Sequence, residues 1–313
     1  MVKTRSRALN NRHAEKKPSD PLRWLGLRFR ALRAFSLPVS VLPVGIATAA
    51  VLSPAEWHWG TLVVCASAVA LLHAAGNLLN DYFDFRSGVD RRMSGDEGRP
   101  GRLLLREEMT PAQVLAEAVA CLVLVAPLVV YLVHTSGPMM LWPGAVAVAA
   151  LYAYTGPPFQ LKYRALGEPL IFLVFGPCLM TGAAYVQTGE FEWLAFMLSI
   201  PVGFATTAIL VGNNIRDYQE DSQARITTIA HVAGKGAGVI YIFLVVASVL
   251  WVAVLSATRF APPVLALSPV VLVLVWKPLV QVWRGERVPD IDVQTARFES
   301  VFLLFMLVAF ILG

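Results

Sequence analysis

Nine stretches of about 20 mostly apolar residues recur along the chain, and a helix of that length and composition crosses the hydrocarbon core of a bilayer. The dense apolar run of the last stretch covers only Val301 to Leu312, and the stretch reaches spanning length by including the polar residues 294–300. The sequence therefore predicts an all-α, polytopic membrane protein. The nine predicted spans cover residues 36–54, 60–80, 114–134, 138–156, 167–187, 191–213, 236–257, 262–283 and 294–312.

The composition excludes other classes of protein. Of the 313 residues, 57% are hydrophobic and 15% are charged, whereas soluble globular proteins contain about 25% charged residues. Disordered chains are poor in apolar residues, so disorder is excluded as well. Three cysteines, each within a predicted span, are too few for a disulfide scaffold. The first 20 residues are polar and basic, so we expect no cleavable signal peptide.

The positions of Lys and Arg predict the orientation of the spans. With the N-terminus in the cytoplasm, 25 of the 26 basic residues fall on the cytoplasmic side and only Arg259 falls on the other. This predicts a multi-pass protein of the inner (cytoplasmic) cell membrane and explains the net charge of +5 without nucleic acid. We predict a basic cytoplasmic arm and interfacial segment over residues 1–35, with an amphipathic stretch at Trp24–Phe35, followed by a nine-span domain over 36–313.

Two polar clusters interrupt the apolar pattern where spans leave the membrane on the cytoplasmic side. Each cluster consists of one amide and two carboxylates, namely Asn77, Asp81 and Asp84 in the first and Asn213, Asp217 and Asp221 in the second. At about 100° per residue, the first set lies within an arc of roughly 60° on a helix and the second within roughly 80°. Each cluster should therefore project from one helical face.

Carboxylates at the edge of the hydrocarbon are costly unless they are paired or bind a metal. Oxygen ligands without His or Cys favour Mg²⁺, with Mn²⁺ as the alternative, and protein-bound Mg²⁺ commonly contacts substrate phosphates. We predict that the four Asp residues bind this metal and take part in catalysis on a diphosphate substrate. Four further residues, Asn77, Asn213, Arg86 and Lys162, are predicted to bind substrate.

Two alternatives fit the clusters less well. A cation transporter would place its carboxylates near the middle of its spans, whereas these lie at span ends. A CDP-alcohol phosphotransferase also uses membrane Asp motifs with metal, but its pattern has an Asp-Gly pair followed by Ala-Arg. Here Asp84 is followed by Phe85 and Arg86.

A diphosphate held by metal at the mouth of an apolar bundle suits a substrate with a long hydrocarbon tail. The metal and basic residues would stabilise the departing diphosphate. Loss of diphosphate from an allylic carbon leaves a carbocation that water would quench, so the reaction needs a dry site. Prenyl transfer onto an electron-rich aromatic ring meets these requirements.

The motifs N-D-Y-F-D-F-R-S-G-V-D at 80–90 and N-N-I-R-D-Y-Q-E-D at 213–221 resemble those of the UbiA-type intramembrane prenyltransferases. Within that superfamily the chain is most similar to the 1,4-dihydroxy-2-naphthoate polyprenyltransferases of menaquinone synthesis. The supporting stretches are A-F-S-L-P-V-S-V-L-P at 34–43, G-E-P-L-I-F-L-V-F-G-P at 167–177 and Y-V-Q-T-G at 185–189.

The resemblance implies nine spans around a central cavity that cytoplasmic loops cap. It also implies Asp motifs that bind Mg²⁺–diphosphate, and a polyprenyl diphosphate and an aromatic acid as substrates. Naphthoate members exchange the ring carboxylate for the prenyl chain and release carbon dioxide and diphosphate. Transfer to 4-hydroxybenzoate, homogentisate or a tetrapyrrole remains an alternative, and no protein partner can be inferred.

The sequence departs from the family pattern at two places. After the second motif, Ile226 takes the place of a usual lysine, so a phosphate contact should be missing there unless Arg225 replaces it. The 91–102 loop also lacks a close match, which would fit a different acceptor or donor length.

Overall fold

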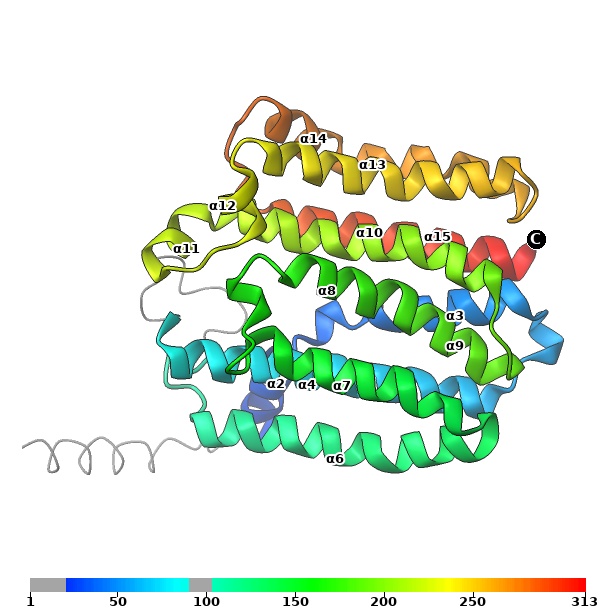
Figure 1. Ribbon diagram of the computed structural model, residues 1–313, viewed down its shortest axis with the longest axis horizontal. Helices are drawn as coiled ribbons and strands as arrows, with labels where there is room; N and C mark the ends of the chain where they lie inside the picture. The colour runs from blue at the N-terminus through cyan, green and yellow to red at the C-terminus, as the bar shows by residue number, and fades with distance from the viewer. Residues whose placement is uncertain (1–20, 90–102) are drawn as a thin grey trace, which may run out of the picture.

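The computed structural model describes residues 21–89 and 103–313. Within these ranges every element is a helix, and the only strand-like pairing is an isolated bridge between Arg164 and Thr227. The long helices run side by side along the long axis of the molecule (Figure 1). The predicted all-α class is therefore confirmed. The basic arm up to residue 20, Asp90 and the 91–102 loop lie outside the described residues.

Eight helical segments of the described chain are long and apolar enough to cross a membrane, so the protein is a multi-pass membrane protein. Six are single helices or a helix with a preceding turn: η1–α3 (Ala34–Ser36 and Pro38–Val51), α4 (Trp59–Ser87), α6 (Pro111–Ser136), α10 (Trp193–Arg216), α13 (Gly236–Ala257) and α15 (Ile291–Leu312). The other two consist of several segments: α8–η5–α9 (Gly167–Leu173, Val174–Cys178 and Leu179–Thr188) and η6–α14 (Pro263–Val275 and Trp276–Trp283).

The predicted count of nine spans is not exact, because the stretch at 138–156 forms a shorter helix. After the 3₁₀ turn η3 (Pro138–Met140), helix α7 (Leu141–Thr155) has 15 residues. At 1.5 Å per residue it is about 22 Å long, whereas the hydrocarbon core is about 30 Å thick. Helix α7 packs against α4 in the bundle (Figure 1).

Helix α15 reaches spanning length although its first half is polar. Thr295 is fully buried and its hydroxyl lies 2.8 Å from that of Tyr241 on α13. Glu299 is also fully buried, and it accepts a hydrogen bond of 2.5 Å from Thr206 on α10. Neighbouring helices thus satisfy the Thr295 hydroxyl and one carboxylate oxygen of Glu299, whereas the other Glu299 oxygen is buried without a hydrogen-bond partner among the described residues.

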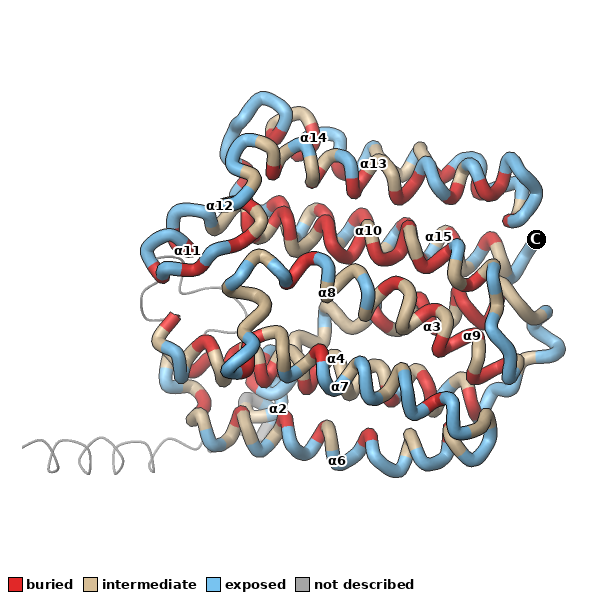
Figure 2. The backbone as a smooth tube through the Cα atoms, in the orientation of Figure 1, coloured by how far each residue is buried: buried red, intermediate tan, exposed pale blue. Residues whose placement is uncertain are grey.

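Two glycines allow α10 to pack closely against the α8–η5–α9 segment. A Cβ atom on Gly176 would lie 2.7 Å from the carbonyl oxygen of Ser199, and one on Gly203 would lie 2.8 Å from the ring of Phe172. Such close backbone approach is typical of small residues between membrane helices. Helix α10 is consequently the most buried of the eight spans, whereas α6 is the most exposed (Figure 2).

Helix α2 (Pro21–Ala31) precedes the first span and packs on α4 and α6. Leu27 and Ala31 are buried in this packing, and Arg28 forms an ion pair of 2.9 Å with Glu117. Leu22 and Phe29 remain exposed. The segment is helical with one buried side, and its place at a membrane interface stays a prediction.

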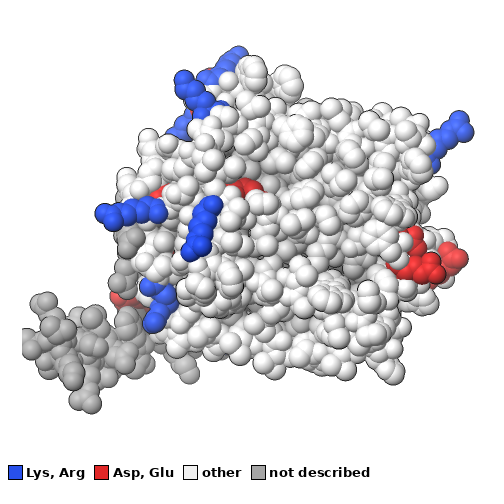
Figure 3. All heavy atoms as spheres, in the orientation of Figure 1, with Lys and Arg blue, Asp and Glu red and all other residues white. Residues whose placement is uncertain are grey.

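Charged side chains separate toward the two ends of the bundle. Figure 3 shows Lys and Arg gathered at the end that carries α11 (Tyr218–Ala224) and α12 (Ile229–Ala233). The opposite end of this face shows mostly acidic side chains. This arrangement agrees with the predicted asymmetry of basic residues, since cytoplasmic ends of spans are enriched in Lys and Arg.

Candidate active site

The first polar cluster lies in the last turns of α4. The helix continues to Ser87 and stops at Gly88, whose φ of 74° is a left-handed conformation that suits glycine. Asp81 and Asp84 are both buried, each with 6% of its surface exposed. Two buried carboxylates one turn apart need positive partners, because an unpaired buried charge is strongly destabilising.

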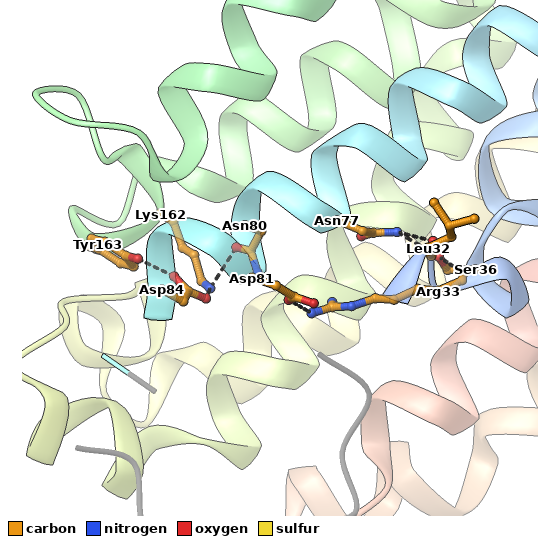
Figure 4. A network of polar contacts seen from close by, with 9 residues as sticks. All are labelled: Leu32, Arg33, Ser36, Asn77, Asn80, Asp81, Asp84, Lys162 and Tyr163. Carbon is orange, nitrogen blue, oxygen red and sulfur yellow. Dashed lines mark hydrogen bonds and ion pairs between the residues drawn. The ribbon is translucent and has the colours of Figure 1, made fainter. Parts of the chain in front are cut away.

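Arg33 is the partner of Asp81. Its guanidinium lies 2.5 Å from the Asp81 carboxylate, although the two residues are 48 positions apart in the sequence. Asn77 strengthens the same junction, since its amide donates to the carbonyl oxygen of Leu32 at 3.2 Å and to the hydroxyl of Ser36 at 3.5 Å (Figure 4). The turn before α3 is thus fastened to α4 beside the acidic cluster.

Lys162, in the 3₁₀ turn η4 (Leu161–Tyr163), is the partner of Asp84. Its ammonium lies 2.7 Å from the Asp84 carboxylate and 3.0 Å from the Asn80 amide oxygen, and the Tyr163 hydroxyl donates to Asp84 as well (Figure 4). Burial alone would lower the pKa of Lys162, but the Asp84 carboxylate together with Tyr154 and Tyr163 outweighs burial and raises the pKa above its ordinary value. Lys162 therefore carries a positive charge at neutral pH.

The second polar cluster lies where α10 ends. The helix stops at Arg216, and Asp217 separates it from α11. Backbone hydrogen bonds of 2.8 Å nevertheless join Asp217 to Asn213 and Asp221 to Asp217, so the i to i+4 spacing is kept across the break. Arg216 donates two hydrogen bonds of 2.7 Å to Asp217 and also contacts Asp292 at the start of α15.

Asp221 differs from the other three aspartates. Within the described residues, its carboxylate has no hydrogen bond or ion pair within contact distance. Burial raises the pKa of Asp221 to about 7; Lys162 opposes this shift, and the nearby charges of Asp217 and Glu220 add to it. A cation placed here would favour the ionised carboxylate.

Two loops at this end of the bundle are hydrogen-bonded to each other. The amide of Thr227 donates to the carbonyl oxygen of Tyr163 at 3.2 Å, and the amide of Ala165 donates to the carbonyl oxygen of Thr227 at 2.9 Å. These two bonds form the isolated bridge between Arg164 and Thr227, which we call the loop bridge. It joins the segment that carries Lys162 to the segment that follows Asp221.

Both polar clusters line one cavity of about 960 Å³. At its polar end the wall includes Arg33, Asn77, Asn80, Asp81, Asp84, Lys162, Asn213, Arg216, Asp217, Asp221 and Asp292. Beyond them the wall is mainly apolar and is contributed by several helices, with Ala68, Leu72, Val129, Leu132, Met140, Ala147, Leu170, Ile171, Phe175, Leu179 and Ala183. The cavity therefore offers a charged end and a long hydrocarbon-lined body to an amphiphilic molecule.

The structure brings seven of the eight predicted site residues to this cavity and leaves one outside. Arg86 is exposed and does not line the wall. It follows Asp84 by two residues, which is about 200° around a helix, and this geometry could have shown that the two side chains diverge. Its predicted role in substrate binding stays a prediction, as do the roles of the others.

Sequence reasoning did not select several polar residues of the wall. Arg33 falls in the stretch predicted to be amphipathic, for which no partner in the site is expected, yet it pairs with Asp81. Asn80 and Arg216 lie within the two sequence motifs, and this position could have identified them as site residues. Asp292 and Arg297 carried no signal beyond their place near the end of a span. Asp292 contacts Arg216, and Arg297 lines the cavity.

Two further residues of the cavity wall, His73 and Ile226, have well-defined neighbours. His73 lines the cavity and its Nδ1 lies 2.8 Å from the Ser40 hydroxyl, so it joins α4 to α3. Ile226 is 5% exposed, packs with Val89 and Ala224, and also lines the cavity. The departure at Ile226 therefore places an apolar side chain at the charged end.

The donor set of the cavity fits a metal that shares its coordination with a phosphate. Among residues 21–89 and 103–313, no three His, Cys, Asp or Glu side chains form a ready metal cage. The carboxylates instead face the cavity from two sides, and three of them contact cations. Mg²⁺ is typically bound through one or two carboxylates together with substrate phosphates, so it does not need such a cage.

Comparisons with known proteins identify the family of the chain. Residues 40–309 match the UbiA prenyltransferase family. The chain is 32% identical over 285 residues to UbiA prenyltransferase domain-containing protein 1 of Danio rerio, covering 90% of this chain and 83% of the relative. It is 33% identical over 244 residues to 1,4-dihydroxy-2-naphthoate octaprenyltransferase of Mycobacterium leprae, covering 77% and 81%.

The fold is also similar to that of a UbiA homolog from Archaeoglobus fulgidus bound to GPP and Mg²⁺. The TM-score is 0.67 at 16% identity, with 92% of this chain and 100% of that chain covered. The family match decides for a transferase over the cation transporter and the CDP-alcohol phosphotransferase considered from the sequence. We conclude that the chain belongs to the UbiA prenyltransferase family and is an enzyme that transfers prenyl groups.

Proposed function

We propose that the protein transfers a polyprenyl group from its diphosphate to 1,4-dihydroxy-2-naphthoate, a step of menaquinone synthesis. The observation that carries the proposal is one cavity of about 960 Å³, which joins the carboxylates of both polar clusters to a long apolar body. The naphthoate octaprenyltransferase relative, at 33% identity over 244 residues, supports the choice of acceptor.

The metal that we propose is Mg²⁺, with Mn²⁺ as the alternative. Asp81, Asp84, Asp217 and Asp221 would hold it, because they supply oxygen ligands from both sides of the charged end. The structural relative from Archaeoglobus fulgidus is described as bound to GPP and Mg²⁺. When bound, the metal would supply Lewis-acid stabilisation of the departing diphosphate.

The protein's own residues position the donor and exclude water. The prenyl chain lies along the apolar wall, so its allylic carbon faces the charged end. Lys162 and Arg33 hold Asp84 and Asp81 in place and offset negative charge at that end. Asn77 and Asn213 stand on the wall beside the carboxylates and are proposed to contact the diphosphate. Burial keeps the site dry, which protects a carbocation from water.

The transfer balances in atoms and charge. The bond between the allylic carbon and the diphosphate oxygen breaks, and its electron pair leaves with diphosphate. The ring carbon that bears the carboxylate forms the new carbon–carbon bond. The electron pair of the ring–carboxylate bond then returns to the ring as carbon dioxide leaves. The products are the prenylated dihydroxynaphthalene, diphosphate and carbon dioxide.

We also propose that the charged end of the bundle and the N-terminus face the cytoplasm, with the protein in the cytoplasmic membrane. The gathering of Lys and Arg at that end supports this orientation (Figure 3). Cysteine labelling at Trp59, near the other end of α4, and at Tyr218 in α11 tests it, since only the latter should be protected from an impermeant reagent in intact cells.

A panel of donors and acceptors tests the proposed reaction. The purified protein is given labelled prenyl diphosphates of several chain lengths with each of four acceptors, with Mg²⁺ or with a chelator. We expect Mg²⁺-dependent product with 1,4-dihydroxy-2-naphthoate, and release of labelled carbon dioxide from its carboxylate. Product only with 4-hydroxybenzoate, homogentisate or a tetrapyrrole would overturn the choice of acceptor and leave the family assignment intact.

A further inference from the structure

Four basic side chains of the described residues line the cavity: Arg33, Lys162, Arg216 and Arg297. The first three each contact an aspartate of the charged end, at 2.5 Å, 2.7 Å and 2.7 Å respectively. Arg297 differs, since within the described chain it has neither an ion pair nor a hydrogen bond. Among the described residues, it is therefore the cavity-lining cation that no carboxylate contacts.

Arg297 belongs to the second turn of α15 and, among the described residues, forms no ion pair with the carboxylates of the charged end. Asp292 precedes it by five residues, about 140° around the helix, and is bound to Arg216. Glu299 follows by two residues, about 200° around the helix, and is buried against Thr206 of α10 instead. Arg297 itself is exposed to the cavity.

The wall around Arg297 suits an aromatic ring. Apart from Asp292, which is bound to Arg216, the other cavity residues of the same helix are small or apolar: Val293, Ala296, Ser300 and Val301. Helix α15 packs against α3, and Phe35 in the turn before α3 lines the same cavity while 68% of its surface is exposed. A planar ring can pack on such surfaces while its charged substituent meets the guanidinium.

We propose that Arg297 binds the carboxylate of the aromatic acceptor and so selects an aromatic acid over a neutral ring. A guanidinium binds a carboxylate through two parallel hydrogen bonds, which fixes the plane and direction of the acceptor. This role rests on the proposed function, because it assigns the acceptor side of that reaction to α15. The carboxylate-bearing carbon is then presented to the allylic end of the donor.

The test compares a carboxylate with its neutral amide as inhibitors of prenyl transfer by the full chain in liposomes. The probes are 1-hydroxy-2-naphthoate and 1-hydroxy-2-naphthamide, and the variants are Arg297→Met and Arg297→Lys. We expect the wild type to prefer the carboxylate about 10- to 100-fold, as a charge-assisted pair provides. Arg297→Met should lose this preference, and Arg297→Lys should keep part of it. The KM for the prenyl diphosphate should not change in either variant.

Arg284→Met is the matched control, because this arginine is exposed, follows α14 and does not line the cavity. It should retain the full preference. An unchanged preference in Arg297→Met would overturn the inference, and so would an equal rise in KM for both substrates, which would indicate a general charge effect. A change that appears only with anionic lipids would assign Arg297 to a headgroup instead. A wild type that uses no aromatic acid would overturn the proposed function together with this inference.

Discussion

The aspartates lie at two helix ends, the first exit at the end of α4 and the second exit at the end of α10, and these two ends are built differently. At the first exit one unbroken helix of 29 residues presents Asp81 and Asp84, and their cations come from 48 and 78 positions away in the sequence. At the second exit the helix breaks at Asp217, whose guanidinium partner is the adjacent Arg216. Asp221 has no such contact within the described residues.

This difference assigns separate tasks to the two exits. The first is held together by contacts between distant segments, so its geometry depends on the completed fold. The second has local pairing and one carboxylate, Asp221, that no cation among the described residues contacts directly. A buried carboxylate without a direct partner favours an added cation. We therefore propose that the first exit is the fixed side of the site and that the second would gain most from a bound metal.

The largest expected effect is loss of one carboxylate at either exit. We expect Asp81→Ala and Asp217→Ala each to lower kcat/KM for prenyl transfer by about a thousandfold, because each removes stabilisation of the departing diphosphate. Labelled prenyl diphosphate measures the rate, and size-exclusion profiles check that the variants insert and fold. Glu286→Ala, at an exposed position outside the cavity, is the control. Full activity in both Asp variants would refute the metal–diphosphate model.

The next effect concerns stability and should appear at the first exit. Arg33→Met leaves the Asp81 carboxylate buried without its partner, so we expect the free energy of unfolding to fall by about 3 kcal/mol. Denaturant unfolding in mixed micelles measures it. Adding Asp81→Asn should recover part of the loss. A single variant within about 0.5 kcal/mol of the wild type would mean that this distant pair does not hold the first exit together.

A third effect should separate binding from stability at the second exit. We expect Asp221→Asn to unfold as the wild type does, because no ion pair is lost, yet to bind Mg²⁺ about 10- to 100-fold more weakly in the presence of a non-reacting prenyl diphosphate analogue. The metal dependence of the thermal transition reports this affinity. Unaltered Mg²⁺ affinity would remove Asp221 from the metal site.

The smallest effect comes from the hydroxyl at the first exit. Tyr163→Phe removes one hydrogen bond to Asp84 while Lys162 remains, so we expect kcat/KM to fall about two- to tenfold. Steady-state rates at saturating Mg²⁺ measure it. A loss as large as that of Asp81→Ala would show that Tyr163 does more than orient Asp84.

The fold was largely predictable because span length is a local property of the sequence. The exceptions have physical causes. Helix α7 stops at Thr155, short of spanning length, although its composition is apolar. Helix α15 begins at Ile291 and includes Thr295 and Glu299, because inside the bundle Tyr241 contacts the Thr295 hydroxyl and Thr206 donates to one oxygen of Glu299. Satisfaction of that kind depends on neighbouring helices and is invisible to a count of apolar residues.

The acidic clusters were predictable for a similar reason, since helical spacing alone places Asn77, Asp81 and Asp84 on one face. Their cations were not. Arg33 reaches Asp81 only because the turn before α3 lies against α4, and Lys162, although predicted to bind substrate, was not predicted to pair with Asp84. Tertiary contacts determine which basic residues pair with the aspartates.

The loop bridge determines which loops can be replaced by those of a relative in a chimeric enzyme. It connects residues 163 and 165 to residue 227 through backbone atoms, so it does not depend on side-chain identity. The segment with Lys162 and the segment after Asp221 consequently form one module, although about 60 residues separate them in the sequence. A chimera that takes only one of these loops from a relative should disturb both exits, whereas one that takes the two together should keep the mouth of the cavity intact.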